Sequence, residues 1–196
     1  MRDPGILLAA AAAALLLAGC GSDGDAEGAG ASSLSKPSIE AAAEPLSYDN
    51  GHPLTAPAAD GGVLALESEV IRLVNAHRVS QGLNALVDTS GIRDVARGHA
   101  QHMIDHRFVG HVNPEGLGAG DRLTLAGIGW SDSGENIAAG YATAQEVFDA
   151  WMASPGHKEV IESPLWTHTG AGYSIDSWPT ENFPYVHYWA QNFLKP

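Results

Sequence analysis

His111, Glu135 and His157 carry the side chains best suited to chemistry, and each directly follows a glycine. Glycine lets the backbone turn sharply, so a neighbouring side chain can point from a loop into a cleft. Two neutral imidazoles and one carboxylate are the ligand set of open zinc sites, which keep one position for water. We therefore expect a site for zinc or another divalent cation. The separations are loop-sized, so a cluster that only fixes loops stays an alternative.

The remaining histidines are weighed against simpler roles. His99, His102 and His106 fall in one predicted helix. His99 lies on its apolar stripe and is most simply a hydrogen-bonded core residue. His102 and His106, four residues apart on the other face, have a spacing that can hold a metal ion, but we interpret them as two solvated polar residues. Three more have no recognisable context and are assigned no role: His52, His168 and His187.

Two amphipathic helices are predicted early in the region that positions these residues. Apolar residues recur at i, i+3, i+4 and i+7 over 64–81 and over 90–104. Gly82 is expected to follow the end of the first helix, and Ser90 to cap the start of the second. A loop rich in glycine and charge is expected over 110–134.

The later part of the chain changes from helices to strands. Thr143 and Glu146 form a capping box that begins a third helix, and His157 begins another short turn or helix. Segments 170–175 and 185–193 are aromatic and β-branched, with turn residues between them, which predicts two antiparallel strands. Helices first and strands late indicate an α+β domain.

The first 20 residues have the features of a secretion signal. Arg2 precedes an apolar run of about 13 residues, too short to span a bilayer, which needs about 20. Leu17-Ala18-Gly19-Cys20 resembles the bacterial lipobox, whose cysteine receives acyl chains such as palmitate and becomes the new N-terminus. An ordinary signal peptide with a chance cysteine is the alternative. We favour the lipobox because the chain's single cysteine falls where it is required, and two or more acyl chains anchor a protein stably.

A low-complexity segment separates this leader from the globular region. Residues 21–62 are rich in glycine, alanine, serine, proline and acidic residues, so they cannot bury enough apolar surface to fold, and we predict a disordered acidic tether. The domain is then expected over 63–196. The formal net charge of −13 argues against nucleic acid as a partner, because binding phosphate backbones requires a basic surface.

Motifs over nearly all of 63–196 resemble the CAP/SCP superfamily, which comprises cysteine-rich secretory proteins, antigen 5 and pathogenesis-related proteins. Each motif is loose by itself, but they occur in the family's order. They are Asn75-Ala76-His77-Arg78 with Gly82-Leu83, Ala96 to Met103, Phe108-Val109-Gly110-His111, Arg122 with Ala126-Gly127, Gly134-Glu135-Asn136-Ile137, Trp151 to His157, and Tyr188-Trp189-Ala190-Gln191-Asn192-Phe193.

The resemblance implies a three-layer α-β-α sandwich with a central antiparallel sheet and a cleft. His111, Glu135 and His157 match the family residues that line a site able to hold zinc or another divalent ion. Matching motif positions suggest three further residues that support the cleft: Asn136, Ser154 and Gln191. The sequence departs from the family twice, because a second glutamate after Trp151 is replaced by Ser154 and an asparagine after the last histidine by Val160.

Three functions stay open at this point. The first is a membrane-anchored binding domain outside the cytoplasm that takes a lipid, sterol or glycan from the envelope or the surroundings. The second is a zinc-dependent hydrolase, in which metal-bound water attacks an ester or amide. The missing second carboxylate removes a candidate general base for that reaction. The third is an interaction domain whose His/Glu cluster is purely structural.

Overall fold

The computed structural model describes residues 15–16 and 58–196. Cys20 and almost all of the predicted signal segment and acidic tether lie outside the described residues. Within the described ranges, no helix combines the length and apolar character needed to cross a membrane. Two residues of the predicted signal segment, Leu15–Leu16 (β1), pair antiparallel with β3 (Asp132–Ala139).

The first helix, α1, spans Gly61–Ser80 and begins two residues before the predicted domain boundary. The Asp60 carboxylate accepts hydrogen bonds from the backbone N–H groups of Gly62 and Val63, both at 2.9 Å. This N-cap stabilises the first turn and offsets the poor helix propensity of the two glycines. Gly82 follows the helix with a φ of +77°, as predicted, in the left-handed region that glycine adopts without strain.

The central sheet is built from β2 (Val87–Asp88), β3, β4 (His168–Ile175) and β5 (His187–Lys195). The order across the sheet is β1-β3-β5-β4-β2. The pairs β3–β5 and β4–β5 are antiparallel, and β4–β5 is the pair that the sequence predicts. The short β2 is parallel to β4, so the sheet is mixed at that edge. The sequence analysis missed β3, which begins within the segment predicted as a loop.

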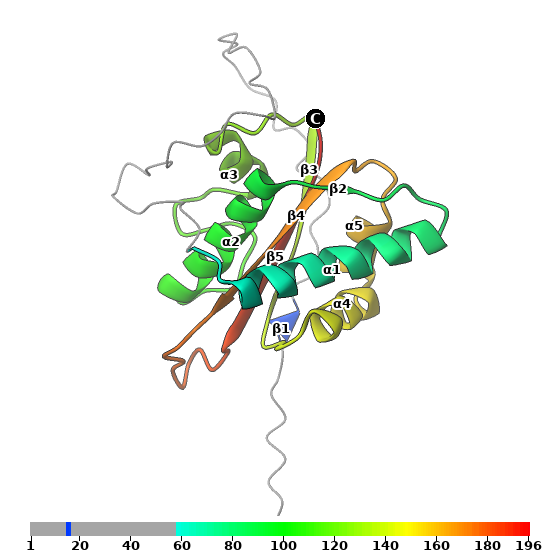
Figure 1. The fold of residues 1–196 in the computed structure, drawn as a ribbon. Helices are drawn as coiled ribbons and strands as arrows, with labels where there is room; N and C mark the ends of the chain where they lie inside the picture. Colours follow the sequence, from blue (N-terminus) through cyan, green and yellow to red (C-terminus); the bar gives the residue numbers. More distant parts are fainter. Residues whose placement is uncertain (1–14, 17–57) are drawn as a thin grey trace, which may run out of the picture.

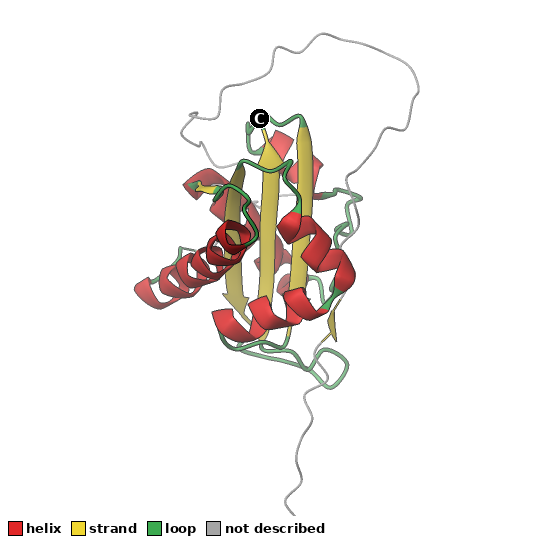
Figure 2. Ribbon diagram, turned by 90° about the vertical axis from the view of Figure 1, so that its right-hand side faces the viewer, coloured by secondary structure: helices red, strands yellow, loops and turns green. Residues whose placement is uncertain are grey.

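Helices cover both faces of the sheet and confirm the predicted three-layer sandwich (Figures 1 and 2). On one face lie α2 (Ser90–Asp105) and α3 (Ala119–Leu125), and α3 is the second element missed in the predicted loop. On the other face lie α1, α4 (Ala144–Ala153) and α5 (Pro155–Glu162). The N-cap of α2 is Thr89 and not the predicted Ser90, which is the first residue of the helix. The Thr89 side chain makes no capping hydrogen bond.

Side chains of β3 alternate between the hydrophobic clusters on the two faces of the sheet. Ile137 and Ala139 of β3 pack in the cluster that contains Met103 of α2, whereas Ala138 packs in the cluster that contains Trp151 of α4. Successive side chains of a strand point to opposite faces. Odd-numbered residues of β3 therefore face the α2–α3 layer, and even-numbered residues face the α1–α4–α5 layer.

Helix α2 packs directly on the backbone of β4. A Cβ atom added at Gly172 would lie 1.9 Å from the backbone nitrogen of Arg97, a separation no side chain can occupy. At the same place Arg97 donates from Nε and Nη2 to the two carboxylate oxygens of Glu67, each at 2.7 Å. Glu67 Oε1 also accepts from the N–H of Tyr173 at 3.1 Å. One buried carboxylate thus joins α1, α2 and β4.

Candidate functional site

Glu135 lies at the centre of a buried polar cluster on the α2–α3 side of β3. His111 Nδ1 lies 3.0 Å from Glu135 Oε1, and Arg122 of α3 donates from Nη2 to Glu135 Oε2 at 2.6 Å. His99 Nε2 of α2 lies 3.9 Å from Glu135 Oε1. We call these four residues the His/Glu cluster: His99, His111, Arg122 and Glu135.

The cluster holds Glu135 in its ionised form. Burial raises the pKa of the carboxyl, but the positive charge of Arg122 and the contacts with His99 and His111 outweigh burial and lower the pKa to about 2. Both oxygens already accept a hydrogen bond or contact an imidazole. A carboxylate with so low a pKa stays ionised at physiological pH and is a weak proton acceptor.

His99 is the buried, hydrogen-bonded core residue that the sequence predicts. Its side chain has no exposed surface, and its Nε2 lies 2.9 Å from the carbonyl oxygen of Gly110. A carbonyl only accepts, so the proton sits on Nε2. Burial, followed by the charge of Arg122, lowers the pKa of His99 to about 3, and the ring is neutral at physiological pH.

Arg122 also fixes the segment that presents His111. Its Nη1 donates to the carbonyl oxygens of His111 and Leu117, at 2.9 and 2.8 Å. One guanidinium therefore orients the carboxylate and the loop that brings the partner imidazole to it. The His111 side chain keeps 19% of its surface exposed, so this imidazole is the solvent-facing member of the His/Glu cluster.

His157 reaches the region from the opposite layer, near the start of α5. It is fully buried, and neither ring nitrogen has a hydrogen-bond partner among the described residues. The amide of Asn136, which alternation turns toward the same layer, donates to the backbone carbonyl of His157 at 3.1 Å. Burial, and then the nearby charge of His111, lower the pKa of His157 to about 4. The ring is neutral, with a lone pair available to a ligand.

The structure thus brings two of the three predicted ligands into contact. The third lies in the layer on the other side of the sheet, close enough for the charge of His111 to lower its pKa. Among the described residues, three potential ligand atoms lie within 4.8 Å of one another only in the group of His102, His106 and Glu115. The donor types at the predicted site fit a divalent cation, and the unpaired nitrogens of His157 fit it as well. Gathering His111, Glu135 and His157 around one ion would need side-chain movement.

The predicted supporting residues have unequal roles. Asn136 holds His157, as described. Gln191 lies opposite Asn136 across the β3–β5 ladder and donates to the hydroxyl of Thr169 at 3.1 Å. Ser154 precedes α5 as its N-cap, but its side chain makes no capping bond. Val160, at the position where an asparagine was expected, packs in the core beside Trp166.

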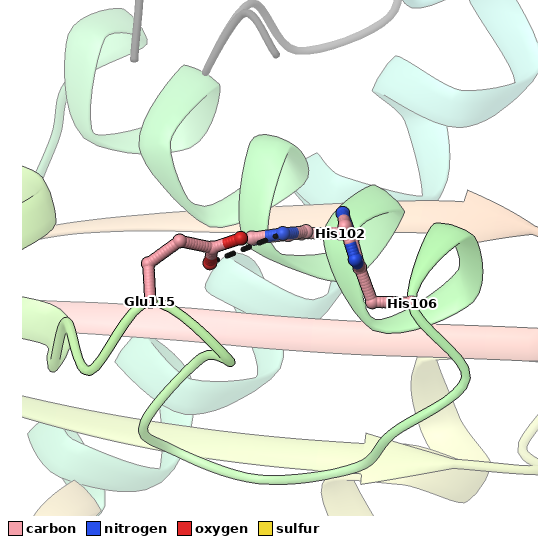
Figure 3. A group of neighbouring side chains, drawn as sticks. All are labelled: His102, His106 and Glu115. Carbon is pink, nitrogen blue, oxygen red and sulfur yellow. Dashed lines mark ion pairs between the residues drawn. The ribbon is translucent and has the colours of Figure 1, made fainter. Parts of the chain in front are cut away.

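The interpretation of His102 as a solvated residue is wrong. His102 is 8% exposed, and its Nε2 lies 3.4 Å from Glu115 Oε2. The rings of His102 and His106 meet edge to face with centroids 4.2 Å apart, and Phe108 packs against His102 as well. The expected polar face is covered because the segment after α2 folds back over it and carries Glu115 to the helix (Figure 3).

Sequence reasoning also missed the roles of Arg122 and Glu115. Arg122 was visible only as part of a family-like motif, because a buried arginine has no periodic signature. Glu115 stands in a loop, and its proximity to His102 follows from the path of residues 106–118, which no local pattern predicts.

Comparison with known proteins agrees with this architecture. The model of the cysteine-rich secretory protein family, CAP, matches residues 71–193, and the chain belongs to that family. The match includes the five residues described above: His99, His111, Arg122, Glu135 and His157.

Two relatives of known sequence come from the bacterium Bacillus subtilis. The chain is 39% identical over 119 residues to uncharacterized protein YkwD of Bacillus subtilis, covering 61% of this chain and 46% of that protein. It is 30% identical over 129 residues to uncharacterized membrane protein YlbC of the same species, covering 66% of this chain and 34% of YlbC. The chain therefore spans less than half the length of these relatives.

Solved structures share the fold. An extracellular protein with an SCP domain from Bacillus anthracis superimposes with a TM-score of 0.61 at 25% identity, over 71% of this chain and 45% of that one. An outer surface protein of Borrelia burgdorferi gives a TM-score of 0.60 at 18% identity, over 72% of this chain and 98% of that one. The second likeness shows the fold alone.

Proposed function

We propose that this protein is a lipoprotein of the cell envelope, anchored through acylated Cys20, whose CAP domain binds a ligand at His111, Glu135 and His157 outside the cytoplasm. One observation carries the binding site: a partly exposed imidazole lies 3.0 Å from a buried, ionised carboxylate. Beside them is a buried imidazole that no described residue satisfies. Buried polar groups are nearly always paired, so this arrangement supports a position completed by something bound.

A divalent cation such as zinc suits these donors. His111, Glu135 and His157 would hold the ion, which would give a ligand's oxygen an electrophilic contact. Arg122 would weaken the binding of the ion. Its guanidinium is paired with Glu135, so less net negative charge is available to attract a cation. We therefore expect moderate affinity for a free cation, increased when an anionic or polar ligand group joins the site.

The ligand we propose is a small apolar or glycan component of the envelope or its surroundings. Val112, adjacent to His111, is 58% exposed and provides apolar contact next to a polar anchor, a combination common in small-molecule sites. Binding is favoured over hydrolysis because the pKa of Glu135 is about 2. A carboxylate so acidic is far from the neutral pKa that suits a general base.

Placement outside the cytoplasm rests on the leader and on the relatives. The B. anthracis relative is called extracellular, and YlbC is called a membrane protein. Mass spectrometry of the mature N-terminus tests the anchor. We expect an acylated cysteine at position 20 in the membrane fraction, and release of the protein from membranes in Cys20→Ser. An unmodified serine or glycine at the N-terminus would reject it.

Isothermal titration with zinc tests the site. The full chain in detergent is used with His106→Asn as background, because the group around His102 can also take zinc. His111→Ala and His157→Ala should each weaken binding by roughly 100-fold or more, since each removes a ligand. His168→Ala, remote from the cluster, should leave it unchanged. Equal heats in all four proteins would show that the His/Glu cluster is structural.

A further inference from the structure

His102, His106 and Glu115 form a second cluster outside the site just described. Their ligand atoms all lie within 4.8 Å of one another. Figure 3 shows the Glu115 carboxylate pointing at the His102 ring, with the His106 ring standing next to His102. The two histidines come from one end of α2, four residues apart. Residues at that spacing lie on the same helical face. The carboxylate comes from the segment between α2 and α3.

We propose that His102, His106 and Glu115 bind a divalent transition-metal ion of the zinc type, at a site separate from His111, Glu135 and His157. Two imidazoles and one carboxylate suit zinc, copper or nickel better than magnesium or calcium, which prefer oxygen ligands. Three protein donors leave a coordination position for water or a ligand.

The geometry needs little adjustment to close around an ion. Metal bonds of about 2.1 Å at tetrahedral angles place donor atoms about 3.4 Å apart. His102 Nε2 and Glu115 Oε2 already have that separation, 3.4 Å. His106 is half-buried and Glu115 exposed, so both side chains can rotate, whereas His102 is fixed by packing against Phe108. One rigid donor and two adjustable donors can therefore converge without moving the backbone.

The loop that carries Glu115 is already ordered by Asn113. The Asn113 side-chain Oδ1 accepts from the N–H of Leu117 at 2.7 Å, and its backbone carbonyl accepts from the N–H of Gly116 at 2.9 Å. The Asn113 Nδ2 lies 3.5 Å from His102 Nδ1. An ion bound by His102 and Glu115 would tie α2 to the same short segment that presents His111. The second site is thus placed to stiffen the loop of the first.

Zinc titration of the full chain in detergent tests the second site directly. The experiment is run in a His111→Ala, His157→Ala background, so that failure of the proposed ligand site does not affect the result. We expect one equivalent of zinc to remain bound. His106→Asn and Glu115→Gln should each weaken this binding by roughly 100-fold or more. The matched controls His168→Asn and Glu181→Gln, at distant positions, should not change it.

A second variant separates a metal site from a simple ion pair. Metal at Nε2 of His102 leaves the proton on Nδ1, which then needs an acceptor. Asn113→Asp supplies a carboxylate oxygen there and keeps the other for Leu117, so zinc binding should tighten by about tenfold. No zinc binding in the background protein, or binding that His106→Asn and Glu115→Gln leave unchanged, would overturn the proposal. Binding that Asn113→Asp weakens would overturn the assignment of Nε2 as ligand.

Discussion

The guanidinium of Arg122 lies 2.6 Å from the carboxylate oxygen of Glu135 that His111 does not contact. Both partners are almost wholly buried, with side chains 0% and 3% exposed. The same guanidinium binds two loop carbonyls. Arg122 therefore both neutralises the charge of Glu135 and holds the loop that carries His111.

Removing that charge should destabilise the fold. Arg122→Gln leaves Glu135 ionised and buried without its cation, and breaking such a pair costs about 3–5 kcal/mol. Urea denaturation at neutral pH measures the loss. Arg72→Gln is the matched control, because Arg72 pairs with Glu69 on the surface, where both side chains are largely exposed, and exposed pairs contribute little. Equal stability of the two variants would contradict the buried pairing.

Stability should fall as the solution becomes acidic, beginning at the ordinary pKa of histidine. The pKa of His99 is lowered from 6.5 to about 3 and that of His157 to about 4 by burial. Between these values and 6.5 the unfolded chain binds more protons than the folded one, so the free energy of unfolding decreases as pH falls through this window. Below about 4.5 Glu135 adds to the loss, because its folded pKa is about 2.

His99→Gln isolates one contribution to this pH dependence. Glutamine can still donate to Gly110 but does not titrate, so the free energy of unfolding should change less steeply between about pH 6.5 and 4.5. The wild type should lose an additional amount on the order of a few kcal/mol. Denaturation curves at several pH values give both slopes. Parallel slopes would mean that His99 is protonated as easily in the folded protein as in the unfolded chain.

The contact of α2 with β4 predicts a strong effect of one methyl group. Gly172→Ala would place a Cβ 1.9 Å from the backbone nitrogen of Arg97. Because backbone atoms cannot yield as a flexible side chain does, the cost should be about 3 kcal/mol or more. Gly61→Ala, at the start of α1, meets nothing within 4 Å and should be neutral or stabilising. Thermal unfolding of the two variants compares them; similar melting temperatures would contradict the close packing.

Local signals predicted much of the fold. The capping box of Thr143 and Glu146 is present, with the N–H of Thr143 donating to Glu146 at 3.0 Å. The last two strands are found close to their predicted bounds. The missed elements lack a strong local pattern: β3 is buried on both faces, so its alternation is hidden, and α3 has only seven residues.

The site was predicted less completely because its geometry is tertiary. The pairing of His111 with Glu135 depends on β3 and on the loop that Arg122 holds, neither of which a sequence period indicates. His102 was misjudged because helical periodicity identifies a face but not what later covers it. The family resemblance pointed to His111, Glu135 and His157, of which the first two are in contact. The place of His157 in the other layer follows from the tertiary fold, which no local pattern indicates.

Anomalous diffraction at the zinc edge, from crystals of the protein grown with zinc, tests the proposed binding site most directly. We expect a peak about 2.0–2.2 Å from donor atoms of His111, Glu135 and His157, with the His157 ring turned toward the ion. Occupied zinc elsewhere in the same crystal, but none at these residues, with His111 still hydrogen-bonded to Glu135, would contradict the account.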